Sequence, residues 1–271
     1  MKERLDVLLV KKGFCDSREK AKRLVMAGLV YVDGQRGEKP GAMVEEEGAI
    51  FVKGQDCPYV SRGGLKLEKA LDWFEIDLKG LVCADMGAST GGFTDCCLQR
   101  GAEKVYAMDV GYGQLDWRLR KDPRVVNMEK VNIRYLDTER FDKPVDFVSI
   151  DVSFISLTLI LPVAWRLLKE GGRLVCLVKP QFEAGREQVG KKGIVKDPAV
   201  HRQVMEKVAC FARQLGFTLG GATYSPMTGA KGNIEYLLYF EKNPQKENIS
   251  KIDFEQTASR VIMEAHEKLM K

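Results

Sequence analysis

The sequence predicts a small α+β domain followed by a larger α/β domain whose sheet is mostly parallel. The chain of 271 residues is long enough for one large domain or two unequal ones. Short apolar runs alternate with helical patterns through most of its length, which is typical of a parallel sheet covered by helices. The segment 53–60 contains Gly and Pro and has no periodicity, which indicates a linker.

Residues 1–55 are predicted to form a helix, a second helix and a hairpin. Leu5, Leu8 and Leu9 recur at helical spacing. The pair Asp16-Ser17 can cap a second helix, because short polar side chains accept hydrogen bonds from the first free amides. The hairpin strands are expected at 30–32 and 50–52, with a turn signal at Asp33-Gly34.

The α/β domain is predicted to span residues 63–271, after a linker at 56–62. It begins with a helix that includes Leu67 and is followed later by a helix at 158–168. The last two strands, near 218–224 and 234–240, are joined by a loop too short for a helical crossover, so we expect an antiparallel hairpin. A final amphipathic helix is expected from Phe254 to Leu269. The parallel strands are expected at 81–85, 104–109, 125–127, 145–151 and 174–178.

The composition is that of a soluble globular protein, with 45% hydrophobic and 30% charged residues. No apolar run approaches the roughly 18–20 residues that span a bilayer, and charges stand where a signal peptide would be apolar. We therefore expect a cytoplasmic protein without a membrane partner. Seven cysteines without a Cys-x-x-Cys pair indicate buried thiols rather than a metal or redox site. The two histidines, His201 and His266, are expected on helix surfaces, and the oligomeric state is not predicted.

A glycine-rich turn from Asp85 to Phe93 follows the first strand of the α/β domain. The carboxyl end of that strand is where such folds bind their ligands. The spacing is neither Gly-x-Gly-x-x-Gly nor a P-loop with its lysine, which disfavours dinucleotides and nucleoside triphosphates. Asp109 ends the next strand, where a carboxylate can accept both hydroxyls of an adenosine ribose.

Two carboxylates at these positions favour S-adenosylmethionine, because its methionyl ammonium and its sulfonium are both positive. The sequence therefore predicts a methyltransferase rather than a dehydrogenase. The alternative is structural: Asp85 would cap a helix and Asp109 would lie in a surface turn. The residues predicted to contact the cofactor are Asp85, Gly87, Ser89, Thr90, Gly91, Gly92, Phe93, Asp109, Asn132 and Phe154.

Two lysines and two carboxylates are predicted to face the same crevice. Lys66 lies at the start of the helix before the first strand, Asp151 and Lys179 end the fourth and fifth strands, and Glu235 opens the last. A ribose hydroxyl is a poor nucleophile at neutral pH and needs a base or stabilisation of its alkoxide. A second ammonium nearby and partial burial favour the neutral form of a lysine, so either lysine can act as that base. The alternative is that the four residues form ordinary salt bridges.

Basic residues crowd the polar face of the second predicted helix, and such a run is usually a solvated face. The order of several short patterns adds to this signal: Arg4-Leu5-Asp6, Gly13, Ser17-Arg18, Ala21, Gly28 and Val30-Tyr31-Val32-Asp33-Gly34. With these residues, segment 3–52 resembles the S-four RNA-binding module, which implies recognition of structured RNA through phosphates and shape. A second basic stretch, from Lys179 to Asp197, is expected to be either a mobile loop that meets RNA over the active site or a disordered surface loop. The predicted RNA-binding residues are Arg4, Lys11, Lys12, Arg18, Lys20, Lys22, Arg23, Arg62, Lys191 and Lys192.

Five motifs together resemble one known family. They are Ser-Arg-Gly-Gly-x-Lys-Leu, Asp-x-Gly-x-Ser-Thr-Gly-Gly-Phe-Thr-Asp, Ile-Asp-Val-Ser-Phe-Ile-Ser, Val-Lys-Pro-Gln-Phe-Glu and Gly-Asn-Ile-Glu. The chain looks like the TlyA family, whose members are known as hemolysin A-like proteins and as rRNA 2′-O-methyltransferases. The match runs from the N-terminal module nearly to the C-terminus, and only the linker at 56–60 matches loosely.

The resemblance implies a Rossmann-like class I methyltransferase domain of the FtsJ type that uses S-adenosylmethionine. It also implies a Lys-Asp-Lys-Glu tetrad on Lys66, Asp151, Lys179 and Glu235. In that tetrad Lys179 is the base, Lys66 stabilises the oxyanion, and the two carboxylates orient the lysines. The implied substrate is cytidine in the ribosomal RNA of ribosomal subunits.

Two other functions stay open at this point. A membrane-acting cytolysin, suggested by the older family name, needs a membrane-spanning or pore-forming segment. The one strong candidate is the C-terminal helix, which is more simply packed on the sheet. An RNA-binding protein with an inactive enzyme domain is disfavoured by the intact acids, glycines and lysines.

Overall fold

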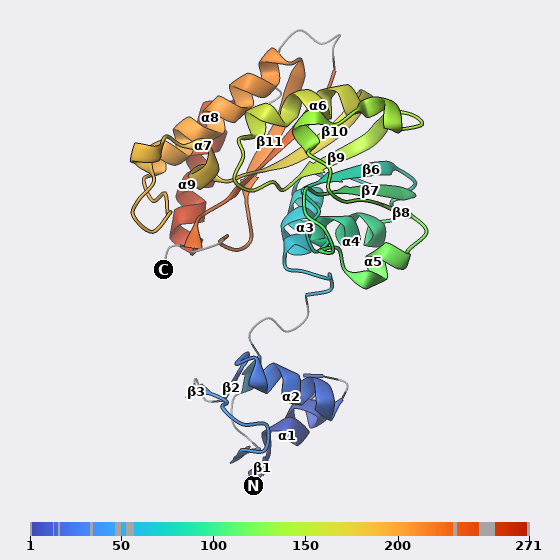
Figure 1. Cartoon of the computed structure of the whole chain (residues 1–271). Helices are drawn as coiled ribbons and strands as arrows, with labels where there is room; N and C mark the ends of the chain where they lie inside the picture. The colour runs from blue at the N-terminus through green and yellow to red at the C-terminus, as the bar shows by residue number, and fades with distance from the viewer. Residues whose placement is uncertain are drawn as a thin grey trace. The chain divides into compact units, whose positions relative to one another are not determined.

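The computed structural model divides the chain into two compact units, Met1–Pro58 and Tyr59–Lys271 (Figure 1). Three features of the sequence analysis lie outside the described residues: the cap candidate Asp16, the turn Asp33-Gly34 and part of the linker, 53–56. The structure describes residues 2–12, 14–15, 17–32, 35–46, 50–52, 57–229, 232–243 and 253–269.

The N-terminal unit packs two helices, α1 (Leu5–Lys11) and α2 (Arg18–Met26), with short β-strands. The hydroxyl of Ser17 accepts a hydrogen bond from the amide of Lys20 at 3.3 Å, which confirms the predicted cap. The predicted hairpin is present: β2 (Val30–Val32) pairs antiparallel with β5 (Ile50–Val52) and with β3 (Gln35–Arg36). A further pair, β1 (Lys2–Arg4) with β4 (Met43–Glu45), was not predicted because β1 consists of three charged residues and shows no apolar run. The core consists of Leu5, Leu9, Cys15, Ala21, Val25, Val30 and Val52.

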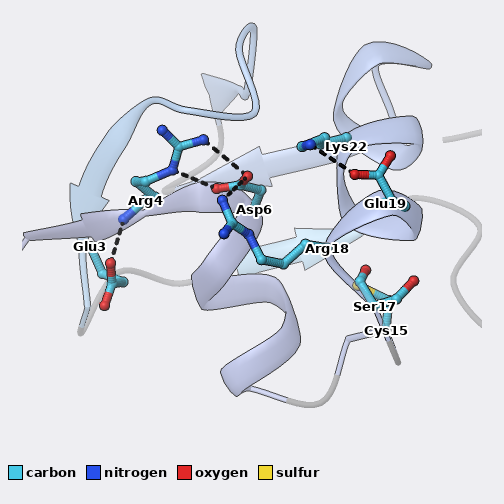
Figure 2. A network of polar contacts seen from close by, with 8 residues as sticks. All are labelled: Glu3, Arg4, Asp6, Cys15, Ser17, Arg18, Glu19 and Lys22. Atoms are coloured by element: carbon cyan, nitrogen blue, oxygen red, sulfur yellow. Dashed lines mark hydrogen bonds and ion pairs between the residues drawn. The ribbon is translucent and has the colours of Figure 1, made fainter.

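A buried carboxylate joins the two helices of this unit (Figure 2). Asp6 of α1 is fully buried and accepts two hydrogen bonds from the guanidinium of Arg4 and one from that of Arg18, each at 3.0 Å. The hydrogen bond from Arg4, reinforced by Arg18, lowers the pKa of Asp6 to about 2. Asp6 therefore stays ionised near neutral pH and keeps both guanidinium groups together.

Asp6→Asn is expected to destabilise the N-terminal unit at pH 7 by about 1–3 kcal/mol, because charge-assisted hydrogen bonds are lost. The folded-state pKa of Asp6 lies below its unfolded value, so this contribution is complete above about pH 4 and is lost as the pH falls towards 2. Hydrogen exchange of the α1 amides in the full chain measures this contribution of Asp6 to stability. Equal protection of these amides in wild type and Asp6→Asn at pH 7 would contradict this role.

The C-terminal unit contains a seven-stranded sheet in the order β11-β12-β10-β9-β6-β7-β8. Strands β8, β7, β6, β9 and β10 are parallel, and β12 runs antiparallel to both of its neighbours, as predicted. The chain order reverses between β6 and β9, and ligands bind at such a switch point in Rossmann-like sheets. The strands are β6 (Val82–Met86), β7 (Lys104–Met108), β8 (Val125–Met128), β9 (Val145–Ile150), β10 (Leu168–Val178), β11 (Phe217–Tyr224) and β12 (Tyr236–Lys242).

Helices cover both faces of this sheet (Figure 1). Residues Val82, Ala84 and Met86 of β6 share one core with α6, α8 and α9, while Asp85 faces α4 on the other side. The α-helices are α3 (Gly63–Trp73), α4 (Gly92–Gln99), α5 (Trp117–Lys121), α6 (Leu161–Leu167), α7 (Pro180–Glu183), α8 (Pro198–Gln214) and α9 (Phe254–Leu269). The 3₁₀ turns are η1 (Ile133–Tyr135), η2 (Thr138–Arg140), η3 (Leu157–Leu159) and η4 (Arg186–Gln188). The helix expected at 158–168 is therefore split between η3 and α6, and Leu168 already opens β10.

His201 corrects the expectation that both histidines lie on helix surfaces. It is fully buried on the apolar stripe of α8, with Nδ1 2.7 Å from the hydroxyl of Tyr236 and Nε2 3.0 Å from the carbonyl of Val195. His266 of α9 places its Nε2 3.1 Å from His201 Nδ1. Burial lowers the pKa of His201 to about 4, so the ring is neutral at pH 7.

The basic stretch from Lys179 to Asp197 is not one irregular loop, since it contains α7 and η4. The buried side chain of Asn233 holds the second half of this stretch through hydrogen bonds to its backbone. The Asn233 amide oxygen accepts from the amide of Val195 at 3.1 Å, and its Nδ2 donates to the carbonyl of Gly193 at 2.9 Å.

Candidate active site

The turn between β6 and α4 is rich in glycine because other backbone passes very close to it. A Cβ on Gly87, whose φ is +95°, would lie 2.5 Å from the carbonyl oxygen of Asp151. A Cβ on Gly92 would lie 2.8 Å from the amide nitrogen of Gly64 in α3. Any larger residue would push apart the elements that meet here, so these glycines let α3, β6 and the end of β9 converge.

A cavity of about 440 Å³, here called the main cleft, lies at the ends of β6, β7 and β9. It combines carboxylates with an apolar wall, a composition suited to a ligand that carries both positive charge and an aromatic ring. Its lining residues are Gly87, Ser89, Asp109, Val110, Gln114, Val131, Asn132, Ile133, Asp151, Val152, Ser153, Phe154, Ile155 and Ile160.

Asp109 holds two backbone segments at the rim of the main cleft. Its Oδ2 accepts a hydrogen bond from the amide of Ser89 at 2.8 Å, and its Oδ1 accepts one from the amide of Gly111 at 2.7 Å. Each carboxylate oxygen has a second lone pair. Asp109 can therefore organise the turn and still accept hydroxyl groups from a ligand.

A second cavity of about 260 Å³, here called the lysine pocket, adjoins the main cleft. The two cavities share Gly87, Ser89, Asp151 and Ser153, so a ligand in one can reach a ligand in the other. The lysine pocket is lined by Ser61, Gly63, Lys66, Gly87, Ala88, Ser89, Thr90, Gly92, Phe93, Asp151, Ser153 and Lys179.

The four residues predicted to do the chemistry form two separate ion pairs. Lys179 Nζ lies 2.6 Å from Asp151 Oδ1, and Lys66 Nζ lies 2.6 Å from Glu235 Oε2. The lysine side chains are only 9% and 12% exposed, respectively, so each pair is screened little by water. Glu235 is buried and lines neither cavity, whereas the other three line the lysine pocket.

Sequence reasoning missed a fifth polar residue of this cluster, Ser153. Lys179 Nζ donates a hydrogen bond to its hydroxyl at 2.9 Å, so Lys179 is held by both Asp151 and Ser153. Ser153 follows Asp151 by two residues in one of the quoted motifs, and that proximity was the only available signal. Ser61, which lines the lysine pocket, likewise opens a quoted motif, whereas nothing in the sequence pattern pointed to Gln114 of the main cleft.

Asp85 lies behind the glycine turn and lines neither cavity. It is fully buried, accepts a hydrogen bond from the hydroxyl of Thr94 at 2.7 Å, and lies 3.5 Å from the hydroxyl of Ser149. Burial raises the pKa of Asp85 to about 7, and the negative charges of Asp151 and Asp109 contribute to the rise. The structure thus places Asp85 as a support of the turn, not at the cavity wall.

The other predicted cofactor residues fall into three groups. Ser89, Asn132 and Phe154 line the main cleft, while Thr90 and Phe93 line the lysine pocket. Gly91 lines neither cavity, and its φ of +100° instead starts α4 in contact with α5. Phe154 is 90% exposed and has a φ of +64°, a rare backbone conformation for a bulky side chain.

The predicted RNA-binding residues lie on both units. In the N-terminal unit Arg4 and Arg18 bind Asp6, Lys11 pairs with Glu46, and Lys22 pairs with Glu19. In the same unit, Lys12, Lys20 and Arg23 are exposed. In the C-terminal unit Arg62 is exposed between Ser61 and Gly63, which line the lysine pocket, and Lys191 and Lys192 are exposed on the segment fastened by Asn233.

The described residues contain neither a candidate membrane span nor a candidate metal cluster. None of the helices in this part of the chain is long and apolar enough to cross a membrane. The same residues contain no group of three or more His, Cys, Asp or Glu side chains able to hold a metal ion.

Known proteins similar to this chain include two bacterial relatives and one solved structure. YqxC of Bacillus subtilis, provisionally named an rRNA methyltransferase, is 52% identical over 99% of this chain and 95% of its own. TlyA of Mycobacterium tuberculosis, a 16S/23S rRNA (cytidine-2′-O)-methyltransferase, is 45% identical over 87% of this chain and 88% of its own. A structure from Streptococcus thermophilus, provisionally described as a hemolysin, is 48% identical, covers 99% of this chain and 97% of its own, and has a TM-score of 0.78.

Two family matches account for most of the sequence. Residues 3–50 match the S4 domain, and residues 59–242 match the FtsJ-like methyltransferases. The second match contains the main cleft, the lysine pocket and both ion pairs. The chain therefore belongs to the FtsJ-like methyltransferase family and carries an S4 domain at its N-terminus.

Proposed function

We propose that this protein transfers a methyl group from S-adenosylmethionine to the 2′-hydroxyl of a ribose, that of cytidine, in ribosomal RNA. The observation that carries the proposal is the lysine pocket, where two largely buried lysines with separate carboxylate partners line a cavity that shares residues with the main cleft. The names of the two bacterial relatives support rRNA as the substrate, and that of TlyA supports cytidine. We infer that the protein acts on ribosomal subunits in the cytoplasm.

The main cleft suits S-adenosylmethionine. Asp109 at the rim can accept the two ribose hydroxyls, and Val131, Ile133 and Ile155 offer an apolar wall for adenine. Asp151, shared by both cavities, is a negative charge close to where the cationic sulfonium has to lie for transfer. The bound cofactor supplies an electrophilic methyl group, and the remaining task of the protein is to position and deprotonate the acceptor.

Lys179 is the proposed base. In its neutral form its amine takes up the proton of the 2′-hydroxyl on Nζ, which restores the ammonium that Asp151 stabilises at 2.6 Å. Lys66 donates a hydrogen bond to the developing alkoxide, while the buried Glu235 holds Lys66 in place. The two cavities share lining residues, so an acceptor in the lysine pocket can lie beside the methyl group, and such proximity favours transfer.

The basic surfaces are proposed to bind RNA. Arg4 and Arg18, fixed by Asp6, present guanidinium groups of defined geometry, which suits bidentate contacts to phosphate (Figure 2). Arg62, Lys191 and Lys192 are proposed to contact the RNA phosphates around the target ribose.

The cytolysin alternative is not favoured. The apolar face of α9, the earlier candidate for a pore-forming segment, is buried in the core through Ala258, Val261, Ile262 and Ala265. The alternative of an inactive enzyme domain is also not favoured, because both ion pairs and the glycine turn are intact.

Lys179→Ala is expected to lower kcat for methyl transfer to ribosomal RNA by about 10²–10⁴-fold, because the base is lost. The affinity for S-adenosylmethionine should fall much less than kcat, since Lys179 lines only the lysine pocket and Glu183 still holds the 151–157 turn. Transfer of labelled methyl to isolated ribosomal subunits measures kcat, and calorimetry measures affinity. Lys169→Ala is the matched control, because it breaks an ion pair with Asp146 outside both cavities. Full activity of Lys179→Ala would refute the assignment.

The affinity for S-adenosylmethionine is expected to rise roughly threefold to tenfold from pH 6 to pH 8. Asp85 has a pKa of about 7, and its ionised form, which increases with pH, attracts a cationic ligand. Asp85→Asn should remove this pH dependence, and calorimetric titration at several pH values tests it. The same pH dependence in both proteins would show that Asp85 is not its source.

Lys191→Glu combined with Lys192→Glu is expected to weaken binding to ribosomal RNA roughly tenfold or more near 0.1 M salt, because two phosphate contacts become repulsive. The affinity for S-adenosylmethionine should not change, as neither residue lines the main cleft. Lys79→Glu with Lys143→Glu is the matched control. These exposed lysines precede the amino ends of β6 and β9, whereas the cavities lie at the carboxyl ends of the strands. Equal RNA affinity of the two double variants would discard this surface.

A further inference from the structure

Glu183 is a buried carboxylate close to the proposed active site that the proposed chemistry does not use. It ends α7, four residues after Lys179, and its side chain is 2% exposed. Its Oε1 accepts a hydrogen bond from the amide of Leu157 at 2.6 Å, and its Oε2 accepts one from the hydroxyl of Ser156 at 2.6 Å. Glu183 thus ties α7 to the start of η3.

The charge of Glu183 is balanced from the opposite side. Lys207 of α8 places its Nζ 3.5 Å from Glu183 Oε2 and donates a hydrogen bond to the carbonyl of Glu183 at 2.9 Å. The Lys207 side chain is 48% exposed. The Lys207 ammonium therefore stays hydrated while it binds the end of α7. The hydrogen bonds that Glu183 accepts from Ser156 and Leu157 are, in contrast, buried.

The segment 151–157 is held at both of its ends by the segment 179–183. At one end Lys179 binds Asp151 and Ser153, and at the other Glu183 binds Ser156 and Leu157. Between these two points, the rings of Phe154 and Phe182 pack with their centroids 4.9 Å apart. The segments that follow β9 and β10 are therefore joined at both ends and in the middle.

This double attachment explains the backbone of Phe154. A φ of +64° is unfavourable for a bulky residue and persists only where the surroundings enforce it. The enforced turn places Val152, Ser153, Phe154 and Ile155 in the wall of the main cleft. Loss of the Glu183 attachment would allow the turn to relax and the wall to move.

We propose that Glu183 is a positioning residue that sets the shape of the cofactor cleft and the geometry of the Lys179–Asp151 pair by holding the 151–157 turn to α7. The proposal rests on the proposed function, since it assigns the main cleft to S-adenosylmethionine. Glu183 acts through Ser156 and Leu157 and does not itself touch the ligand.

Glu183→Ala is the primary test. It is expected to raise the Kd for S-adenosylmethionine about tenfold or more, because two short hydrogen bonds to a buried carboxylate are lost. It should also lower kcat, while the KM for RNA stays near wild type. Glu183→Gln should restore the affinity, because its amide can accept from Leu157 and donate to Ser156. Lys207→Ala is the matched control, which removes the charge partner but leaves the attachment, and it should bind nearly as wild type.

Ser156→Ala provides a milder variant should Glu183→Ala fail to fold. This variant loses the hydrogen bond to Glu183 and also the η3 cap, in which the Ser156 hydroxyl accepts from the Thr158 amide at 3.2 Å. We expect it to raise the Kd for S-adenosylmethionine roughly threefold, with faster hydrogen exchange confined to 152–158. Wild-type Kd and kcat in both Glu183→Ala and Ser156→Ala, or in Ser156→Ala alone if Glu183→Ala does not fold, would overturn the proposal. So would failure of Glu183→Gln to restore affinity in a folded protein. Because cofactor binding is measured without RNA, failure here is distinguishable from an error about the RNA substrate.

Discussion

The ion pair between Lys179 and Asp151 is the interaction on which the proposed site depends. It requires β9 and β10 to be parallel neighbours, because each residue immediately follows its strand. Glu235 reaches the same edge only because β12 runs the other way: Tyr236 pairs with Val178, so the residue before β12 lies beside the residue after β10. The antiparallel end of the sheet is thus what gives Lys66 its carboxylate partner.

Positions at strand ends could be predicted from the sequence, because an apolar run shows where a strand stops and a parallel sheet brings such stops to one edge. This reasoning placed Asp151 and Lys179 at one pocket, which Lys66 lines from α3. It failed for the orientation of Asp85. The strand was expected to end at Asp85, whereas β6 extends to Met86, so Asp85 is an internal residue whose side chain faces α4. Side chains alternate between the two faces of a strand, so Asp85 lies on the face opposite Ala84 and Met86.

Residues whose roles depend on a distant partner could not be predicted. Ser153, Glu183 and His201 have ordinary local patterns, and their importance comes from Lys179, Ser156 and Tyr236, which other elements bring to them. The net charge of +5 was equally uninformative. The net charge is small because the basic residues are offset by carboxylates. Some of these carboxylates pair with lysines or arginines, such as Asp6, Asp151 and Glu235.

The central claim, that the acceptor is a ribose 2′-oxygen of ribosomal RNA, is tested most directly by mapping the product. Purified protein is incubated with unmodified ribosomal subunits and S-adenosylmethionine, and the RNA is then cleaved with alkali, which spares a linkage next to a 2′-O-methyl group. We expect protection at defined cytidines and none without the cofactor. Methylation of a base, or no transfer to any subunit or free ribosomal RNA, would contradict the account.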